Sequence, residues 1–245
     1  MCESDSRITG RDKILVNILF ARVTDFNKPR GNMVSLTDMQ NALGEICAYQ
    51  DAHPHLQQCA GFLYNAIDLG DRAIQAEESV DVIIMGMNPG ENPKHKDNIS
   101  PNSKNRWRHL CEEFSAPLGK SWVMSELFFW SSNNLDVLRQ CVDDFENNLF
   151  ENDLSFCAKL NKRLIAFHSP KIVLQPGLTW SVYAREHYDL THVQSVPGRR
   201  GTLIEHHILP DGTPWLVTPH WTSAFGFSSD DRGKIKDYAL RAITA

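Results

Sequence analysis

The chain has 245 residues, of which 42% are hydrophobic and 22% are charged. This length suits one large α/β domain or a domain with a helical addition, and the composition excludes a disordered, fibrous or membrane protein. The net charge of -5, from 25 basic and 30 acidic residues, argues against a protein that coats nucleic acid by bulk charge. No apolar run reaches the roughly 18 residues of a spanning helix, and the polar N-terminus lacks a signal peptide. We therefore expect a cytoplasmic protein with no membrane partner.

Apolar residues recur at helical spacing three times before residue 78, over 14–19, 36–46 and 56–67. A loop with proline and glycine separates the first two stretches, and Pro54 interrupts the pattern before the third. We predict a helical N-terminal extension over residues 1–78 that packs on the core. Nothing in it points to chemistry.

The pattern changes at residue 80. Short, nearly all-apolar runs, the first of them rich in β-branched residues, occur at 80–86, 122–128, 171–175 and 214–218. Helical stretches lie between these runs or after them, at 107–114, 152–167, 180–187 and 229–243. Residues 203–209 and the turn-forming residues 210–213 add a hairpin before the last strand. This alternation predicts an α/β domain over residues 79–245, a three-layer sandwich with a mainly parallel central sheet flanked by helices.

In such a sheet the functional loops follow the carboxyl ends of the strands. Residues 86–90, Gly-Met-Asn-Pro-Gly, follow the first strand and resemble the first motif of the uracil-DNA glycosylase superfamily, in its single-strand-selective monofunctional and mismatch-specific branches. Residues 218–224, Thr-Pro-His-Trp-Thr-Ser-Ala, follow the last strand, where that superfamily has its second motif. They depart from its usual His-Pro-Ser-Pro or Pro-Asn-Pro-Ser pattern. Residues 105–110 resemble the start of the first sheet-covering helix of the mismatch-specific branch. The resemblance covers about residues 80–245 and implies the uracil-DNA glycosylase fold.

The resemblance implies hydrolysis of an N-glycosidic bond in DNA, with Asn88 and His220 as catalytic residues. The reaction develops positive charge on the sugar and negative charge on the departing base, and it needs one water beneath C1′. The Asn88 amide can position that water, and His220 can donate a hydrogen bond to an oxygen of the base. The alternatives are that Asn88 belongs to a simple strand-ending turn and that His220 is a packing or capping residue. If the second motif is shifted by a residue or two, Thr222 and Ser223 contact backbone or phosphate instead.

The chemistry needs no cofactor and no metal. The six cysteines are widely spaced, with no pattern of a metal site, so we expect reduced thiols.

Two departures from the family concern the base. Strict uracil enzymes have a tyrosine after the motif's proline, where it crowds C5 of the base, and Gly90 stands there. Glu126 aligns with the asparagine that reads the uracil edge. An ionised carboxylate accepts from the cytosine N4 amino group but cannot donate to uracil O4. These residues predict a cytosine with a bulky 5-substituent, unless Glu126 is a helix-cap or ion-paired residue beside a shifted alignment. Substrate contacts are predicted at Gly86, Met87, Pro89, Gly90, Glu126, Phe128 and Ser223.

The target base must leave the duplex to reach such a pocket, so we expect DNA contacts around it. Local basic clusters suit phosphate contacts despite the acidic total, although solvated loop charge is the alternative for each cluster. Trp221 and Phe225 suit a wedge or a stacking platform, or else belong to the core. DNA contacts are predicted at Lys94, Lys96, Lys104, Arg106, Arg108, Arg199, Arg200 and Trp221.

We therefore expect a monofunctional DNA glycosylase, a monomer that acts on single- or double-stranded DNA with a modified base. The expected base is a hydroxymethylated or glucosylated cytosine of foreign or phage DNA, and the product is an abasic site. The alternatives are a uracil or mismatched-thymine glycosylase of base-excision repair and a noncatalytic nucleic-acid-binding protein of the same fold. An unrelated α/β hydrolase is disfavoured because the sequence has no Gly-x-Ser-x-Gly elbow, phosphate loop or dinucleotide fingerprint.

Overall fold

The structure is a computed structural model that describes residues 36–59, 79–87, 106–119, 121–130, 149–222 and 228–244. All of these residues belong to one compact unit, residues 34–245.

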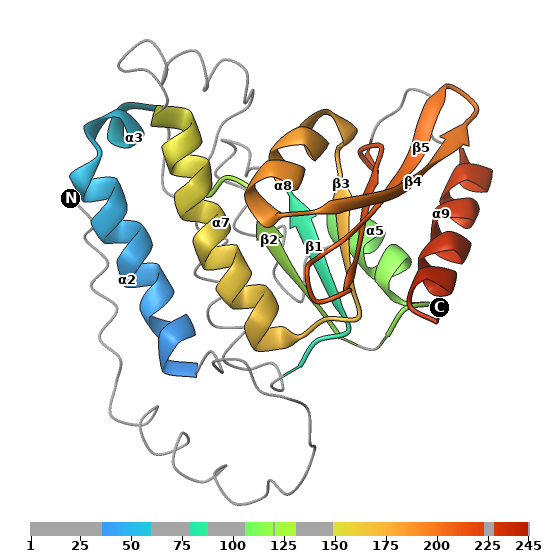
Figure 1. The fold of residues 1–245 in the computed structure, drawn as a ribbon, viewed down its shortest axis with the longest axis horizontal. Coiled ribbons are helices and arrows are strands. Elements are labelled where there is room, and N and C mark those ends of the chain that lie inside the picture. The colour runs from blue at the N-terminus through green and yellow to red at the C-terminus, as the bar shows by residue number, and fades with distance from the viewer. Residues whose placement is uncertain are drawn as a thin grey trace, which may run out of the picture. The chain divides into compact units, whose positions relative to one another are not determined.

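A six-stranded sheet forms the centre of this unit (Figure 1). Its strands lie in the order β2-β1-β3-β6-β5-β4, and the pairs among β2, β1, β3 and β6 are parallel. β5 is antiparallel to β6, and β4 is antiparallel to β5. The strands are β1 (Val82–Gly86), β2 (Trp122–Glu126), β3 (Ile172–Pro176), β4 (Thr191–Gly198), β5 (Gly201–Ile208) and β6 (Pro214–Thr218). The predicted mainly parallel sheet and the β5–β6 hairpin are confirmed.

The buried strands coincide with the apolar runs, whereas β4 was not predicted. Every residue of β1 and β3 is buried, as expected for central strands covered on both faces. β4 lies at the sheet edge, and six of its eight residues are exposed. A strand with both faces in water has no hydrophobic alternation to reveal it.

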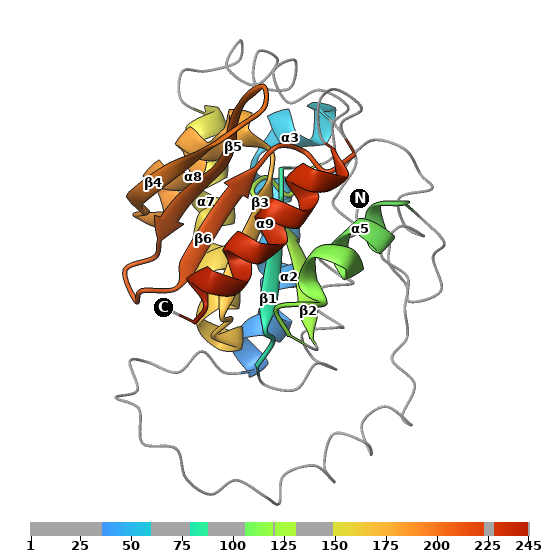
Figure 2. The same cartoon turned by 90° about the vertical axis from the view of Figure 1, so that its right-hand side faces the viewer.

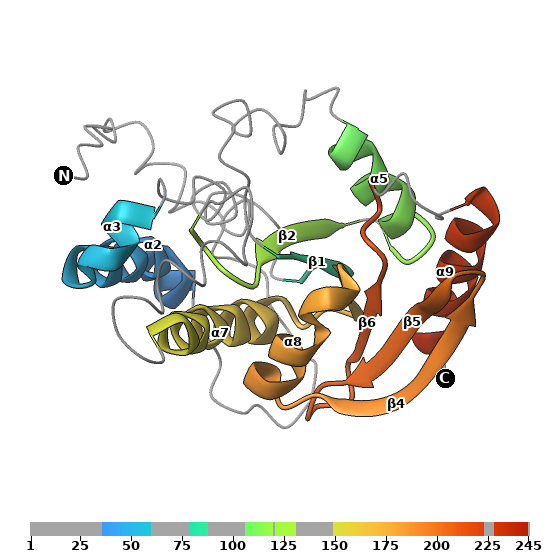
Figure 3. The same cartoon turned by 90° about the horizontal axis from the view of Figure 1, so that it is seen from above.

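Helices cover both faces of the sheet (Figures 2 and 3). α5 (Arg106–Ser115) and α9 (Ser229–Ala242) lie on one face, and α7 (Leu149–His168) and α8 (Ser181–Tyr188) lie on the other. A short 3-10 helix, η2 (Leu178–Trp180), leads from β3 into α8. α9 begins with a capping box: the Ser228 hydroxyl accepts from the Asp231 amide, and the Asp231 carboxylate accepts from the Ser228 amide. The chain thus has an α/β fold with helices on both sides of a mixed, mainly parallel sheet.

Part of the predicted N-terminal extension is helical and packs on α7. α2 (Leu36–Ala52) and α3 (Pro54–Cys59) fall within residues 1–78, and the rest of that range lies outside the described residues. The Arg163 guanidinium on α7 pairs with the Glu45 carboxylate on α2 at 2.6 Å. The domain boundary after residue 78 stays a prediction.

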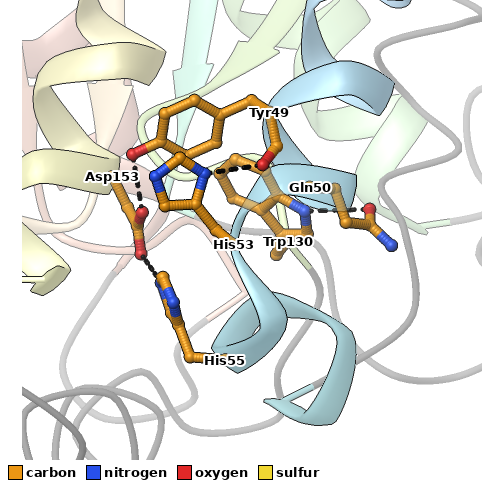
Figure 4. Close-up of polar contacts among 6 residues, drawn as sticks. All are labelled: Tyr49, Gln50, His53, His55, Trp130 and Asp153. Atoms are coloured by element: carbon orange, nitrogen blue, oxygen red, sulfur yellow. Dashed lines mark hydrogen bonds and ion pairs between the residues drawn. The ribbon is translucent and has the colours of Figure 1, made fainter.

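A buried carboxyl group holds α2 and α3 to α7 (Figure 4). Asp153 on α7 has no exposed surface, accepts a hydrogen bond from the Tyr49 hydroxyl at 2.9 Å, and lies 2.9 Å from Nε2 of His55. The Tyr49 ring is stacked between His53 and Phe156, with ring centroids 3.9 Å apart on each side. Burial raises the pKa of Asp153, and the contacts with His55 and Tyr49 oppose that rise.

Asp153→Ala is expected to destabilise the fold by about 3 kcal/mol, because it leaves the Tyr49 hydroxyl and the buried His55 ring without their acceptor. Urea unfolding followed by circular dichroism measures the loss. Lys159→Ala is the matched control, since Lys159 is an exposed residue of the same helix. An equal stability of the two variants would show that the Asp153 contacts contribute nothing.

Candidate functional site

The carboxyl ends of β1, β2, β3 and β6 meet at one edge of the sheet, which we call the strand-end edge. Backbone hydrogen bonds join these ends beyond the strands. The Leu127 amide donates to the Gly86 carbonyl at 2.9 Å, and the Phe128 amide donates to the Met87 carbonyl at 2.9 Å. On the other side, the Gly177 amide donates to the Thr218 carbonyl at 2.7 Å. Both sequence motifs therefore start from fixed backbone at the same edge.

Gly177 follows β3 and contacts Met87, which follows β1, as well as the end of β6. Its φ of 135° is a conformation that favours glycine, and an added Cβ would lie 2.9 Å from the Met87 sulfur. Met87, the second residue of the first motif, therefore packs across the end of β3. Of the other predicted site residues, Asn88, Pro89, Gly90, Ser223, Lys94, Lys96 and Lys104 lie outside the described residues, as do Phe225 and the side chain of Arg106.

His220 follows β6 and is held in one tautomer. Its Nδ1 accepts from the Thr222 amide at 3.4 Å and lies 2.8 Å from the Thr222 hydroxyl. Because Nδ1 accepts from an amide, the proton of the neutral ring is on Nε2. Burial lowers the pKa of His220, so the ring is neutral at neutral pH. The site thus has a neutral imidazole whose Nε2–H is a hydrogen-bond donor.

Trp107 connects His220 to the β2 side of the edge. Its indole is stacked on the His220 ring, with centroids 5.3 Å apart and an interplanar angle of 11°. Its Nε1 donates to the Met124 sulfur on β2 at 3.2 Å. The segment that opens α5 therefore lies beside the second motif. Trp107 joins the candidate site, and only the local resemblance of 105–110 pointed to it.

Trp221 belongs to the core, which corrects its predicted contact with DNA. The indole has no exposed surface, stacks on Phe114 of α5 with centroids 4.2 Å apart, and donates from Nε1 to the Thr218 hydroxyl at 3.0 Å. A side chain enclosed in this way cannot insert into a base stack. Of the two interpretations that the sequence left open, burial favours the core.

Glu126 ends β2 with its carboxyl group in the protein interior. The residue is 5% exposed, and Oε2 has no hydrogen-bond partner among the described residues. An added Cβ on Gly86 would overlap this carboxyl group, so Glu126 lies directly over the first residue of the first motif. Burial raises the pKa of Glu126 to about 8. The alternative of an ion-paired glutamate has no support among the described residues, because no salt bridge there involves it.

Asn161, which the sequence did not reveal, holds the backbone of Glu126. The Asn161 amide nitrogen on α7 lies 2.8 Å from the Glu126 carbonyl and 2.8 Å from the Tyr188 hydroxyl. The Ser125 hydroxyl hydrogen-bonds the Asn161 side-chain oxygen on the same face. Asn161 is one polar residue in an otherwise ordinary amphipathic helix, and no local pattern distinguishes it from a surface residue.

Phe128 lies on the opposite face of the sheet from α5, packed as a core ring. It has no exposed surface, stacks on Phe150 of α7 with centroids 5.2 Å apart and meets Trp130 edge-on at 5.4 Å. A contact between Phe128 and the base stays a prediction.

The described basic residues differ in their availability to DNA. Arg108 pairs with the Glu112 carboxylate at 2.8 Å, and its guanidinium lies 5.6 Å from the centroid of the Trp122 ring, so it is engaged within α5 and β2. Arg199 and Arg200 form the exposed turn between β4 and β5. Because β4 and β6 are both antiparallel to β5, this turn projects at the strand-end edge. There the pKa of Asp231 at the start of α9 is lowered mainly by the hydrogen bonds from Ser228, and Arg199 adds to this effect.

The described residues contain no group of three or more histidine, cysteine, aspartate or glutamate side chains that could hold a metal ion. None of the helices in this part of the chain is both long and apolar enough to cross a bilayer. No family model matches the chain, and no curated protein shows significant sequence similarity to it.

Proposed function

We propose that this protein is a monofunctional DNA glycosylase that removes a flipped-out, 5-substituted cytosine, such as a hydroxymethylated or glucosylated one, from foreign DNA. The observation that carries the proposal is that two suitable groups occur at the same strand-end edge. One is a neutral His220 with its Nε2–H as donor, and the other is a buried Glu126 carboxyl over Gly86 whose Oε2 has no hydrogen-bond partner among the described residues.

These groups suit the two charges that the reaction must manage. As the glycosidic bond breaks, negative charge collects on the base, and a fixed N–H donor in a partly buried site stabilises it with no reorganisation. A neutral His220 can donate a hydrogen bond from its Nε2–H to the base oxygen O2. Asn88, two residues beyond Gly86, is proposed to hold the water that attacks C1′.

The preference for cytosine rests on Glu126 and Gly90. A carboxyl oxygen accepts from the cytosine N4 amino group, which is the contact that acidic side chains make with cytosine in DNA recognition. Glycine at position 90 removes the side chain that would crowd a 5-substituent in the related uracil enzymes.

A uracil glycosylase is the second candidate, and the raised pKa of Glu126 favours keeping it. A protonated carboxyl group has both an O–H donor and a C=O acceptor. It can therefore also pair with O4 and N3–H of uracil. The exposed turn with Arg199 and Arg200, at the same edge, suits contacts to the DNA backbone in either case.

The test is an abasic-site assay on duplexes that are identical except for one base: uracil, mismatched thymine, 5-hydroxymethylcytosine or its glucosylated form. We expect release of the modified cytosine, with strand cleavage only after alkali. Faster release of uracil would make the second candidate correct. Tight DNA binding without release of any base would identify a noncatalytic reader.

A further inference from the structure

The Glu126 carboxyl group is buried at cost to the fold, and nothing in the described structure compensates it. Oε2 has no hydrogen-bond partner among the described residues, although the side chain is 95% buried. Meanwhile the backbone of the same residue is fixed by Asn161 from α7. An anchored residue with an unsatisfied buried acid is the arrangement expected when the missing partner is a ligand.

Among the described residues, none supplies a charged partner to this carboxyl group. From β1, Gly86 has no side chain, and from β2, Met124 is apolar. From α5, the Cys111 thiol interacts with Glu126, and its pKa is raised by burial and by Glu126, so it is neutral. Arg108 and Glu112, farther along α5, pair with each other. His220, across Trp107, is also neutral because burial lowers its pKa.

These surroundings decide the protonation state of Glu126. Burial favours the neutral acid and raises the pKa of the carboxyl group to about 8. At pH 7 the free protein therefore has a carboxylic acid at this position, with one proton to give.

Resting on the proposed function, we propose that Glu126 is a catalytic acid that transfers its proton to N3 of the flipped cytosine as the glycosidic bond breaks. The carboxyl C=O accepts from the N4 amino group, and the O–H faces N3, so the acid matches the Watson–Crick edge of cytosine with two hydrogen bonds.

The step is balanced. The C1′–N1 bond breaks with its electron pair moving to the base, and the resulting charge is shared by the ring nitrogens and O2. The Glu126 proton moves to N3, so the base leaves as a neutral N3–H tautomer and Glu126 becomes a carboxylate. Water adds its oxygen to C1′ and releases one proton, and Glu126 regains a proton from solvent. The net reaction consumes one water and gives the free base and a 1′-hydroxyl abasic site.

The proton matters more for cytosine than for uracil. Uracil has two carbonyl groups over which to spread the charge of the departing base, whereas cytosine has one, so cytosine is the poorer leaving group. Proton transfer from a positioned acid accelerates such steps by about 10² to 10⁴. An acid at position 126 therefore selects cytosine through the rate of bond cleavage rather than through binding.

The test compares the wild-type protein with Glu126→Gln, which has nearly the same shape and keeps one donor and one acceptor but has no transferable proton. On the modified-cytosine duplex we expect Glu126→Gln to bind DNA within threefold of the wild type and to release base about 10² to 10⁴ times more slowly. The wild-type second-order rate constant, which reports the free protein, should fall as pH rises above about 8. The rate constant of Glu126→Gln should not fall in this pH range. That of Glu126→Asp, which keeps a carboxyl group, should show part of the fall seen in the wild type.

Glu186→Gln is the matched control, because Glu186 is an exposed residue of α8, and it should leave both rate and pH profile unchanged. A uracil duplex separates an acid from a mere contact, because Glu126→Gln should slow uracil release less than tenfold. If the wild type releases modified cytosine and Glu126→Gln keeps its rate or its alkaline fall, the acid role is wrong while the proposed function stands. If the wild type releases no base from any duplex, both proposals are overturned.

Discussion

Asn88→Ala is expected to abolish release of the modified base, a loss of about 10³-fold or more in the single-turnover rate. The proposed reaction needs one water held beneath C1′, and the alanine side chain can neither hold that water nor shield the developing cation. The measurement is the single-turnover rate on the glucosylated 5-hydroxymethylcytosine duplex. DNA binding and the thermal unfolding temperature should stay close to the wild-type values.

Asn88→Asp is the companion variant and should retain measurable activity, since a carboxylate can also hold and polarise the water. A wild-type rate in Asn88→Ala would remove the first motif from the mechanism, whatever the substrate.

His220→Ala is expected to slow the chemical step by about 10² to 10³, the scale for removing one donor to a developing negative charge. The bound-state cleavage rate at saturating protein measures this loss separately from DNA affinity. The physical reason is the tautomer: Nδ1 accepts from the Thr222 amide, so Nε2–H is the donor that disappears.

His220→Phe distinguishes this role from packing, because phenylalanine keeps a ring stacked on Trp107 but has no donor. We expect it to be as slow as His220→Ala while unfolding at a temperature closer to that of the wild type. A fast His220→Phe protein would show that the ring serves only to pack against α5. Slower binding with an unchanged cleavage rate would identify a phosphate contact.

The sequence predicted those elements of the fold that leave a pattern in consecutive residues. The parallel strands are buried on both faces, so their residues are apolar in unbroken runs, as in Val82–Gly86. β4 escaped prediction because its residues face water, and Trp221 was misassigned because neighbours in the chain do not reveal which side of a loop is enclosed. Its partner Phe114 is more than one hundred residues away in sequence.

The same limit applies to the site. Position in a motif indicated Glu126 and His220 as candidates, but neither burial nor tautomer can be obtained from spacing. The neutral state of Glu126 depends on its burial close to Cys111 of α5, where Arg108 pairs with Glu112. Likewise, the role of Asn161 depends on a contact across 35 residues of chain.

The overlap between Gly86 and Glu126 constrains how this protein can evolve. A side chain at position 86 would overlap the carboxyl group, so a substitution there requires that the Glu126 side chain moves away or that residue 126 is shorter. The reverse order is open, because shortening residue 126 needs no change at the glycine. A lineage that exchanged the glutamate for a small residue could then fill position 86 and lose the way back. The two positions therefore form an epistatic pair, because a glutamate regained at position 126 could no longer place its carboxyl group over a substituted position 86.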